Sequence, residues 1–236
     1  MIAARDALCL ALDVADADAA MAWVARTRDL VCTYKIGLEL FTAEGPSVVD
    51  RVRRAGAQRI FLDLKLHDIP NTVVGAVRSV ARLGVDDLTV HVAGGRAMLE
   101  AARVAAGSMR LLGVTVLTSL DRAALAEVGE GETEPAELAC LRARLAADCG
   151  LGGIVCSPVE VARIRAVVGA SVRLVTPGIR SATDAAGDQR RTMTPAEARR
   201  AGADLLVIGR PVLAAAQPEE ALRAIVRDVE RADDGR

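Results

Sequence analysis

Lysine is nearly absent from this chain: of its 30 basic residues, only Lys35 and Lys65 are lysines. Arg stays charged under all ordinary conditions, whereas a lysine ammonium is a compact charge that can give up a proton. Both lysines end short apolar runs, VCTYKIG and IFLDLKLHD, and Asp63 and Asp68 flank the second lysine. A general bias toward Arg explains why Lys is scarce, but not why both lysines occupy matching places. We therefore predict that Lys35 and Lys65 form the chemical centre of the protein.

Aromatic residues are also scarce, and the charge is almost balanced. One Trp, one Tyr and two Phe leave no set of rings on which nucleic-acid bases could stack. A formal net charge of −1 gives no electrostatic surface for nucleic acid or an anionic membrane. The amino-terminal region lacks the long apolar run behind a basic stretch that is typical of a signal peptide or a membrane span. We expect no nucleic-acid partner and no membrane association.

The five cysteines lack the spacing of zinc ligands. Cys9, Cys32 and Cys156 lie in apolar runs typical of buried strands, and Cys140 and Cys149 lie on a helical stretch. Reduced thiols in a protein core are typical of the cytosol. The sequence therefore predicts a cytoplasmic globular protein.

A local pattern recurs along the 236 residues: a helical stretch ends in a small residue and Gly, and a short apolar run follows. Gly just past a helix end supplies a left-handed cap, and such a run suits a strand that is buried on both faces. The pattern occurs around Gly56, Gly84, Gly150, Gly169 and Gly202. Together with apolar runs at 8–12, 31–36 and 111–117, it predicts eight strands that alternate with helices. We therefore expect an α/β fold, a (β/α)8 TIM barrel that occupies residues 1–236 as a single domain.

A doubly wound open sheet is the alternative, but no GxGxxG follows the first predicted strand. One polar segment at 176–192, TPGIRSATDAAGDQRRT, interrupts the alternation after the seventh strand. A loop this long inside a compact domain is usually functional or disordered, and it follows a strand on the face where barrel enzymes keep their active sites. We expect it to close over a phosphate.

Five charged residues fall at the carboxyl ends of the first three predicted strands. Side chains alternate along a strand, so Asp63 and Lys65 point the same way, with Asp68 at the start of the following loop. Asp13 ends the first strand and Lys35 ends the second. At an effective dielectric near 20, each Lys–Asp contact at about 4 Å is worth roughly 4 kcal/mol before desolvation. Such an array fixes its own groups and presents an ammonium where negative charge develops.

Each of these carboxylates also has a simpler interpretation. Asp68 could cap the next helix, which has Pro at its first turn, and Asp13 could be an ordinary loop carboxylate. Asp63 and Lys65 could form a structural ion pair. These interpretations weaken when the five charges fall together on one face.

The last predicted strand ends in LLVIGRPV, which is typical of an anion site. Gly209 permits close backbone approach, Arg210 offers a forked donor, and Pro211 suits the start of a helix. The loops after strands seven and eight form the usual phosphate site of these barrels. Arg180 and Gln189 on the long loop could close over the same anion.

The fifth predicted strand ends in VLTSLD, which places Thr118 and Ser119 at the mouth as hydrogen-bond partners for a polar ring or carbonyl. Either residue could instead cap the next helix. His67 and His91 lack further carboxylates at ligand spacing, so we predict no metal site.

Eight segments carry a resemblance to a known family: LALD, YKIGLELF, FLDLKLHDIPNTV, TVHVAGG, VLTSL, VTPGIR, GDQRR and VIGRPV. In this order and spacing, the chain closely resembles the bacterial type of orotidine 5′-phosphate decarboxylase over nearly its whole length. The resemblance implies a cofactor-independent carboxy-lyase that converts orotidine 5′-monophosphate (OMP) to UMP and CO₂ in pyrimidine biosynthesis. It implies catalytic roles for Lys65, Asp63, Asp68 and Lys35, with Lys65 as the proton donor. It implies substrate contacts by Asp13, Lys35, Thr72, Thr118, Ser119, Pro177, Arg180, Gln189, Gly209 and Arg210.

The resemblance further implies a homodimer in which Asp68 and Thr72 enter the active site of the neighbouring subunit. Two alternatives stay open. A Mg²⁺-dependent sugar-phosphate decarboxylase or lyase of the same barrel superfamily also uses an Asp-x-Lys-x-x-Asp pattern. A non-catalytic ligand-binding barrel has little use for both lysines and all three carboxylates.

Overall fold

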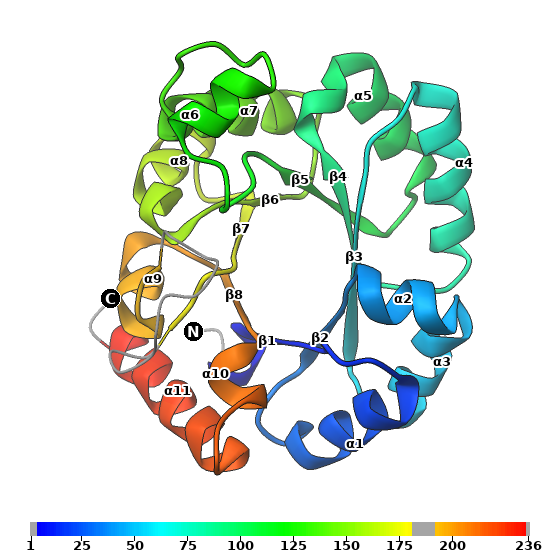
Figure 1. The fold of residues 1–236 in the computed structure, drawn as a ribbon, viewed down its shortest axis with the longest axis vertical. Coiled ribbons are helices and arrows are strands. Elements are labelled where there is room, and N and C mark those ends of the chain that lie inside the picture. Colours follow the sequence, from blue (N-terminus) through cyan, green and yellow to red (C-terminus); the bar gives the residue numbers. More distant parts are fainter. Residues whose placement is uncertain (1–3, 181–191, 235–236) are drawn as a thin grey trace.

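The computed structural model describes residues 4–180 and 192–234. Eight parallel strands pair in chain order, and β8 pairs with β1, so that the sheet closes into a barrel. The strands are β1 (Leu8–Ala11), β2 (Thr33–Ile36), β3 (Arg59–Leu66), β4 (Asp87–His91), β5 (Arg110–Val114), β6 (Gly153–Val155), β7 (Arg173–Thr176) and β8 (Leu205–Ile208). Helices form a ring around the strands (Figure 1). The predicted (β/α)8 barrel is confirmed.

The helices follow the strands in alternation, and several strand–helix units carry an additional short helix. They are α1 (Ala17–Thr27), α2 (Leu38–Glu44), α3 (Ser47–Arg54), α4 (Pro70–Ala81), α5 (Gly95–Ala105), α6 (Arg122–Glu127), α7 (Pro135–Asp148), α8 (Val161–Val168), α9 (Pro195–Ala201), α10 (Arg210–Leu213) and α11 (Pro218–Asp233). Short 3₁₀ turns lie at Ala4–Asp6, Val92–Gly94 and Pro158–Glu160. Among the residues placed in the structure, no helix is both long and apolar enough to cross a bilayer.

The glycines expected after helix ends adopt the backbone that the sequence predicts. Gly56, Gly84, Gly150, Gly169 and Gly202 all have positive φ, between 69° and 119°. A Cβ is disfavoured in this region, so Gly turns the chain back toward the sheet at low cost. One predicted boundary was wrong: the run at 111–117 leaves the strand at Val114. There β6 also ends, and both the N–H and the hydroxyl of Thr115 bond the carbonyl of Val155 instead.

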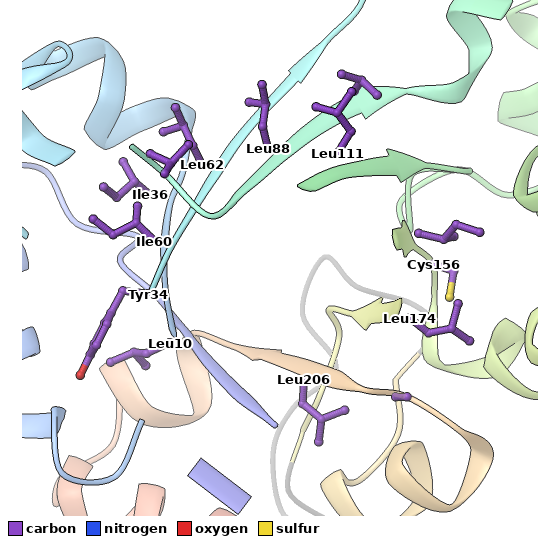
Figure 2. Close-up of a cluster of buried hydrophobic side chains, with 14 of the residues drawn as sticks. Leu10, Tyr34, Ile36, Ile60, Leu62, Leu88, Leu111, Cys156, Leu174 and Leu206 are labelled. Atoms are coloured by element: carbon purple, nitrogen blue, oxygen red, sulfur yellow. The ribbon is translucent and has the colours of Figure 1, made fainter. Parts of the chain in front are cut away.

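The larger core lies between the barrel wall and the helices. Outward-facing side chains from all parts of the wall contribute to it, among them Leu10, Tyr34, Leu62, Leu88 and Leu206 (Figure 2). Burial of these apolar side chains from both layers is the main force that closes the barrel. Even the phenol of Tyr34 is buried, where its oxygen lies 2.9 Å from the Thr27 hydroxyl.

A smaller apolar cluster fills the inside of the barrel. Cys9, Phe61, Leu112 and Val175 form its middle, and we refer to these four residues as the inner apolar layer. Because side chains alternate along a strand, residues two positions before or after these also face the barrel axis. The layer therefore separates two polar groups of side chains, one at each end of the barrel.

The polar group at the amino ends of the strands comprises Arg59, Arg110, Arg173 and Asp87, which we call the lower cluster. Asp87 is fully buried, and its Oδ1 accepts a hydrogen bond from Nη1 of Arg110 at 2.7 Å. Its Oδ2 lies 3.7 Å from Nη1 of Arg173 and has no hydrogen-bond partner. Burial raises the pKa of Asp87 above its ordinary value, against the attraction of both arginines. This cluster borders a cavity of about 480 Å³.

Candidate active site

A cavity of about 470 Å³ opens at the carboxyl ends of the strands, and we call it the mouth pocket. Its floor includes Phe61 of the inner apolar layer, and its walls come from strands β2 and β3 and from the segments that follow β1, β5, β6, β7 and β8. The predicted site residues that line it are Asp13, Lys35, Asp63, Lys65, Thr118, Pro177, Arg180, Gly209 and Arg210.

Both lysines meet on one carboxylate at the base of the mouth pocket. Oδ2 of Asp63 lies 2.8 Å from Nζ of Lys65 and 3.7 Å from Nζ of Lys35. Lys35 also donates to Oδ1 of Asp13 at 3.1 Å. These four residues form an alternating chain of charges in the order Asp13, Lys35, Asp63, Lys65. The predicted array is present, except that Asp68 does not join it within one chain.

Lys65 reaches this position through an irregularity in β3. The pairing of β3 with β4 shifts register between Leu62 and Leu66, so that β3 carries extra residues there. Lys65 has a φ of 49°, and among the residues placed in the structure it is the one non-glycine with positive φ. The alternation of side chains along a regular strand predicted that Asp63 and Lys65 lie on the same side. They do lie on the same side, but in a bulged rather than a regular part of β3.

The charges of the array shift the pKa values of its buried members in opposite directions. Burial alone raises the pKa of Asp63, but the attraction of Lys35 and Lys65 and two hydrogen bonds outweigh it, so the pKa lies below its ordinary value. Burial alone lowers the pKa of Lys35, but Asp63 and Asp13 outweigh it and raise that pKa. Both groups are therefore charged at neutral pH.

The far end of the mouth pocket is suited to an anion. Arg180 is 8% exposed, and Gly209 lies between Asp13 and the first turn of α10, which Arg210 begins. A Cβ at Gly209 would lie 3.2 Å from Oδ2 of Asp13, so a larger residue would crowd that carboxylate. Two guanidinium groups and a helix start beside a glycine provide donors for a phosphate. Gln189 lies outside the described residues.

Three other predicted residues lie away from the pocket of their own chain. Asp68 and Thr72 are exposed on the rim where β3 passes into α4, and Ser119 is exposed in the loop after β5. Oδ1 of Asp68 accepts from the N–H of Ile69 at 2.6 Å, whereas Ile69 is the N-cap of α4 and makes no side-chain cap bond. The simpler interpretation of Asp68 as the helix cap is therefore wrong.

One buried contact of the site was missed from the sequence. The hydroxyl of Thr89, in the middle of β4, bonds both the backbone of Lys65 and the carboxylate of Asp63. In the run DLTVH, Thr is an ordinary strand residue, so no local pattern indicated this role. The one available signal was its place on the strand next to DLKL.

The histidines and cysteines offer no metal site among the residues placed in the structure. His67 and His91 lie with ring centroids 5.5 Å apart. Burial, with smaller contributions from His67 and Lys65, lowers the pKa of His91 to about 4, so its ring is neutral at pH 7. All five cysteines are free thiols.

A closed (β/α)8 barrel with its charged pocket at the carboxyl ends of the strands defines the class: a barrel of the type that carries enzyme active sites on this face. The sequence also matches the model of the orotidine 5′-phosphate decarboxylase / HUMPS family over residues 6–225. The chain belongs to this family.

Individual relatives agree with the family assignment. The chain is 54% identical over 220 residues to the orotidine 5′-phosphate decarboxylase of Anaeromyxobacter sp. strain K, covering 92% of this chain and 96% of the relative. It is 50% identical over 237 residues to the same enzyme of Moorella thermoacetica, covering 96% and 93% of the two chains. The crystal structure of the Lactobacillus acidophilus enzyme matches with a TM-score of 0.82 and 33% identity, covering 95% of this chain and 99% of that one.

Proposed function

We propose that this protein decarboxylates orotidine 5′-monophosphate to uridine 5′-monophosphate, a step of pyrimidine nucleotide synthesis. The observation that carries the proposal is the contact of both lysines with Asp63 in the mouth pocket, at 2.8 and 3.7 Å, in a chain of this family. Relatives at about 50% identity bear the name of this decarboxylase. Neither the sugar-phosphate lyase nor the non-catalytic barrel has comparable support.

The chemistry requires an electrostatic catalyst. When the bond between C6 and the carboxylate breaks, CO₂ leaves and its electron pair stays on C6, in the plane of the ring. The ring π-orbitals cannot delocalise that pair, so fixed positive charge must stabilise it. The Lys65 ammonium is the group that we assign to this role, and it then donates a proton to C6 to give the product.

Asp63 and Lys35 complete the proposed reacting centre. The low pKa of Asp63 keeps its carboxylate ionised beside the leaving carboxylate, where repulsion favours departure of CO₂. Lys35 contacts Asp63 from the other side, at 3.7 Å. We assign Lys35 and Asp13 to the ribose hydroxyls. No step needs a metal or an organic cofactor.

The rest of the pocket would hold the substrate at a distance from the reacting carbon. We assign Thr118, and Ser119 next to it outside the pocket lining, to the pyrimidine. We assign Pro177, Arg180, Gly209 and Arg210, together with Gln189 of the undescribed segment, to the phosphate. Binding energy from the phosphate, far from C6, can be realised in the transition state. Most of the predicted phosphate-closing loop at 176–192 lies outside the described residues.

We further propose a homodimer in which Asp68 and Thr72 complete the active site of the neighbouring subunit. Both residues are exposed on the rim of the mouth pocket, and Ile69 between them is 67% exposed. Leu38, at the start of α2 after the neighbouring strand β2, is 51% exposed. Apolar side chains on this rim fit a contact with a second copy.

Mixing two inactive variants tests the shared site. Lys65→Ala and Asp68→Ala should each be inactive alone, but a random mixture of subunits should restore activity at about a quarter of the sites, because one site of each hybrid dimer is intact. No recovery after exchange of subunits, confirmed by co-purification of a tagged variant with an untagged one, would contradict the shared site.

The decisive measurement is the ultraviolet absorbance of OMP with purified protein and excess EDTA. Steady loss of substrate absorbance with formation of UMP supports the proposal, and Lys65→Arg should nearly abolish it because Arg cannot donate a proton at neutral pH. Activity only on a sugar phosphate, and only once Mg²⁺ is restored, would overturn it in favour of the lyase. Near-normal turnover by Lys65→Arg would remove the proton-donor role.

A further inference from the structure

Thr89 links the two groups of the proposed reacting centre that lie on β3. It is fully buried in the middle of β4, and Asp63 and Lys65 belong to the neighbouring strand. Its Oγ1 lies 2.8 Å from the backbone nitrogen of Lys65 and 2.9 Å from Oδ1 of Asp63. One hydroxyl therefore contacts the main chain of the proposed proton donor and the side chain of its carboxylate partner.

The direction of both hydrogen bonds is fixed by the chemistry of the partners. A backbone N–H can only donate, so Oγ1 accepts from Lys65 and must give its single proton to the ionised carboxylate of Asp63. The two oxygens of Asp63 then have separate partners, since Oδ1 binds Thr89 and Oδ2 binds the Lys65 ammonium at 2.8 Å. Rotation of the carboxylate would break both contacts, so its plane is fixed.

The backbone of Lys65 needs such a partner. A non-glycine residue with φ of 49° is uncommon and persists only where its surroundings hold it there. At the bulge between Leu62 and Leu66, the register of the β3–β4 ladder is interrupted, and the Lys65 N–H bonds the Thr89 side chain. The hydroxyl thus substitutes for a regular ladder bond at the place where the lysine side chain is directed into the pocket.

We propose that Thr89 is a positioning residue, whose hydroxyl holds the Lys65 backbone and the Asp63 carboxylate in the geometry that decarboxylation requires. Thr89 is not among the described residues that line the mouth pocket, so it acts through these two groups without touching the substrate. The catalytic part of this inference rests on the proposed function. The β-branched side chain adds to the effect, because it restricts the rotation that aims the hydroxyl.

Two pairs of variants isolate the hydroxyl. Thr89→Val keeps the shape of the side chain and removes the hydroxyl, and Thr89→Ser keeps the hydroxyl. If the Val variant does not fold, Thr89→Ala and Thr89→Ser form a second pair that differs only in one oxygen. Thr33→Val is the matched control, because Thr33 is also fully buried on the inside of the barrel and its hydroxyl accepts from Nε of Arg59 at 3.2 Å, in the lower half.

The variants should separate by turnover rather than by stability. A displacement of about 1 Å at a reacting group costs about a hundredfold in rate, so kcat of Thr89→Val should fall about tenfold to a hundredfold, with KM within about threefold of wild type. Thr89→Ser should stay within about threefold in kcat. The melting temperature of Thr33→Val should fall, whereas its kcat should equal that of the wild type.

The pH profile gives a readout that a purely structural residue would not change. The hydrogen bond from Thr89 is one cause of the low pKa of Asp63. Its removal should move the acid limb of the kcat profile to higher pH in Thr89→Val and leave it in place in Thr33→Val. A wild-type kcat and acid limb in Thr89→Val, or equal losses in the Ser and Ala variants, would overturn the inference.

Failure of the decarboxylase assignment can be told apart from failure of the inference about Thr89. If the wild-type protein does not turn over OMP, the decarboxylase assignment fails, and the pKa of the Asp63 carboxyl measured by carbon NMR then tests Thr89 alone. A higher Asp63 pKa in Thr89→Val than in wild type and Thr33→Val supports the positioning contact, and an unchanged pKa overturns it.

Discussion

Replacement of Asp63 and Asp13 by Asn separates the effect of burial from the effect of distance on the stability of the charge array. Both carboxylates contact Nζ of Lys35, and the Asp13 contact is the shorter one, at 3.1 against 3.7 Å. The side chain of Asp63 is 12% exposed, whereas that of Asp13 is 56% exposed. If distance governed stability, Asp13 would be the more important residue.

The magnitudes favour burial. At an effective dielectric near 20, the attraction of Asp63 to Lys65 at 2.8 Å is about 6 kcal/mol and its attraction to Lys35 is about 4.5 kcal/mol, before the cost of burial. Removal of one partner from a buried pair costs about 3–5 kcal/mol, and Asn retains the acceptor for Thr89. We therefore expect Asp63→Asn to lose about 3 kcal/mol of unfolding free energy. An exposed pair contributes about 0.2–1 kcal/mol, so Asp13→Asn should lose less than about 1 kcal/mol.

Urea unfolding of the ligand-free protein at pH 7, at one fixed protein concentration, measures this difference. For a chain of this length, about 3 kcal/mol corresponds to a fall of about 6–12 °C in Tm. The folded pKa of Asp63 lies below its ordinary value, so its contribution is present above the unfolded pKa of about 3.9 and is lost as the pH falls through the folded pKa. The deficit of Asp63→Asn should thus be constant from about pH 5.5 to 8 and shrink below about pH 4. Equal losses for the two variants, or a larger loss at Asp13, would refute the dominance of burial.

Three further changes probe other parts of the barrel. The pKa of His91 is lowered to about 4 in the fold, chiefly by burial. The neutral ring therefore stabilises the fold above the unfolded pKa of about 6.5, and this part of the unfolding free energy is lost as the pH falls through 4. Since the ring is half-buried, we expect this loss to be about 1–2 kcal/mol in urea titrations, and His91→Gln should not show it. Because the pKa of Asp87 is raised in the fold, this carboxyl stabilises the protein below its ordinary pKa, and that stabilisation is lost as the pH rises through the folded pKa. Asp87→Asn should therefore leave the unfolding free energy at pH 7 unchanged or higher, with normal kcat. A loss of several kcal/mol in unfolding free energy would contradict this. Arg210→Ala should reduce kcat/KM for OMP far more than for orotidine, and equal losses would remove the phosphate assignment.

Much of the barrel could be predicted from the sequence because its signals are local. Apolar runs mark strands that are buried on both faces, and the glycines after helix ends mark the returns, as at Gly56 and Gly202. The convergence of Lys35 and Lys65 followed from barrel topology alone, since neighbouring parallel strands end at the same rim. Features of this kind depend only on period, spacing and chain order.

The contacts that were not predicted depend on neighbours far apart in the sequence. The left-handed backbone of Lys65 and the hydroxyl of Thr89 that holds it arise from a register shift between two strands, which no local pattern indicates. The lower cluster was missed for the same reason. Arg110 and Asp87 lie at strand starts, where charged residues are usually solvated, and only the closed barrel buries the carboxylate between them.

The inner apolar layer is a medium of low dielectric constant next to the charged mouth pocket. Phe61 precedes Asp63 by two residues on β3 and pairs in register with Lys35 of β2, and burial in the same layer raises the pKa of the Cys9 thiol well above its ordinary value. A medium that disfavours a thiolate also fails to screen the ammonium groups in front of it, so the electric field of the array is directed outward, toward the open end of the pocket. A polar residue of similar size in this layer would therefore weaken the field at the reacting carbon, even if every group that touches the substrate stayed in place.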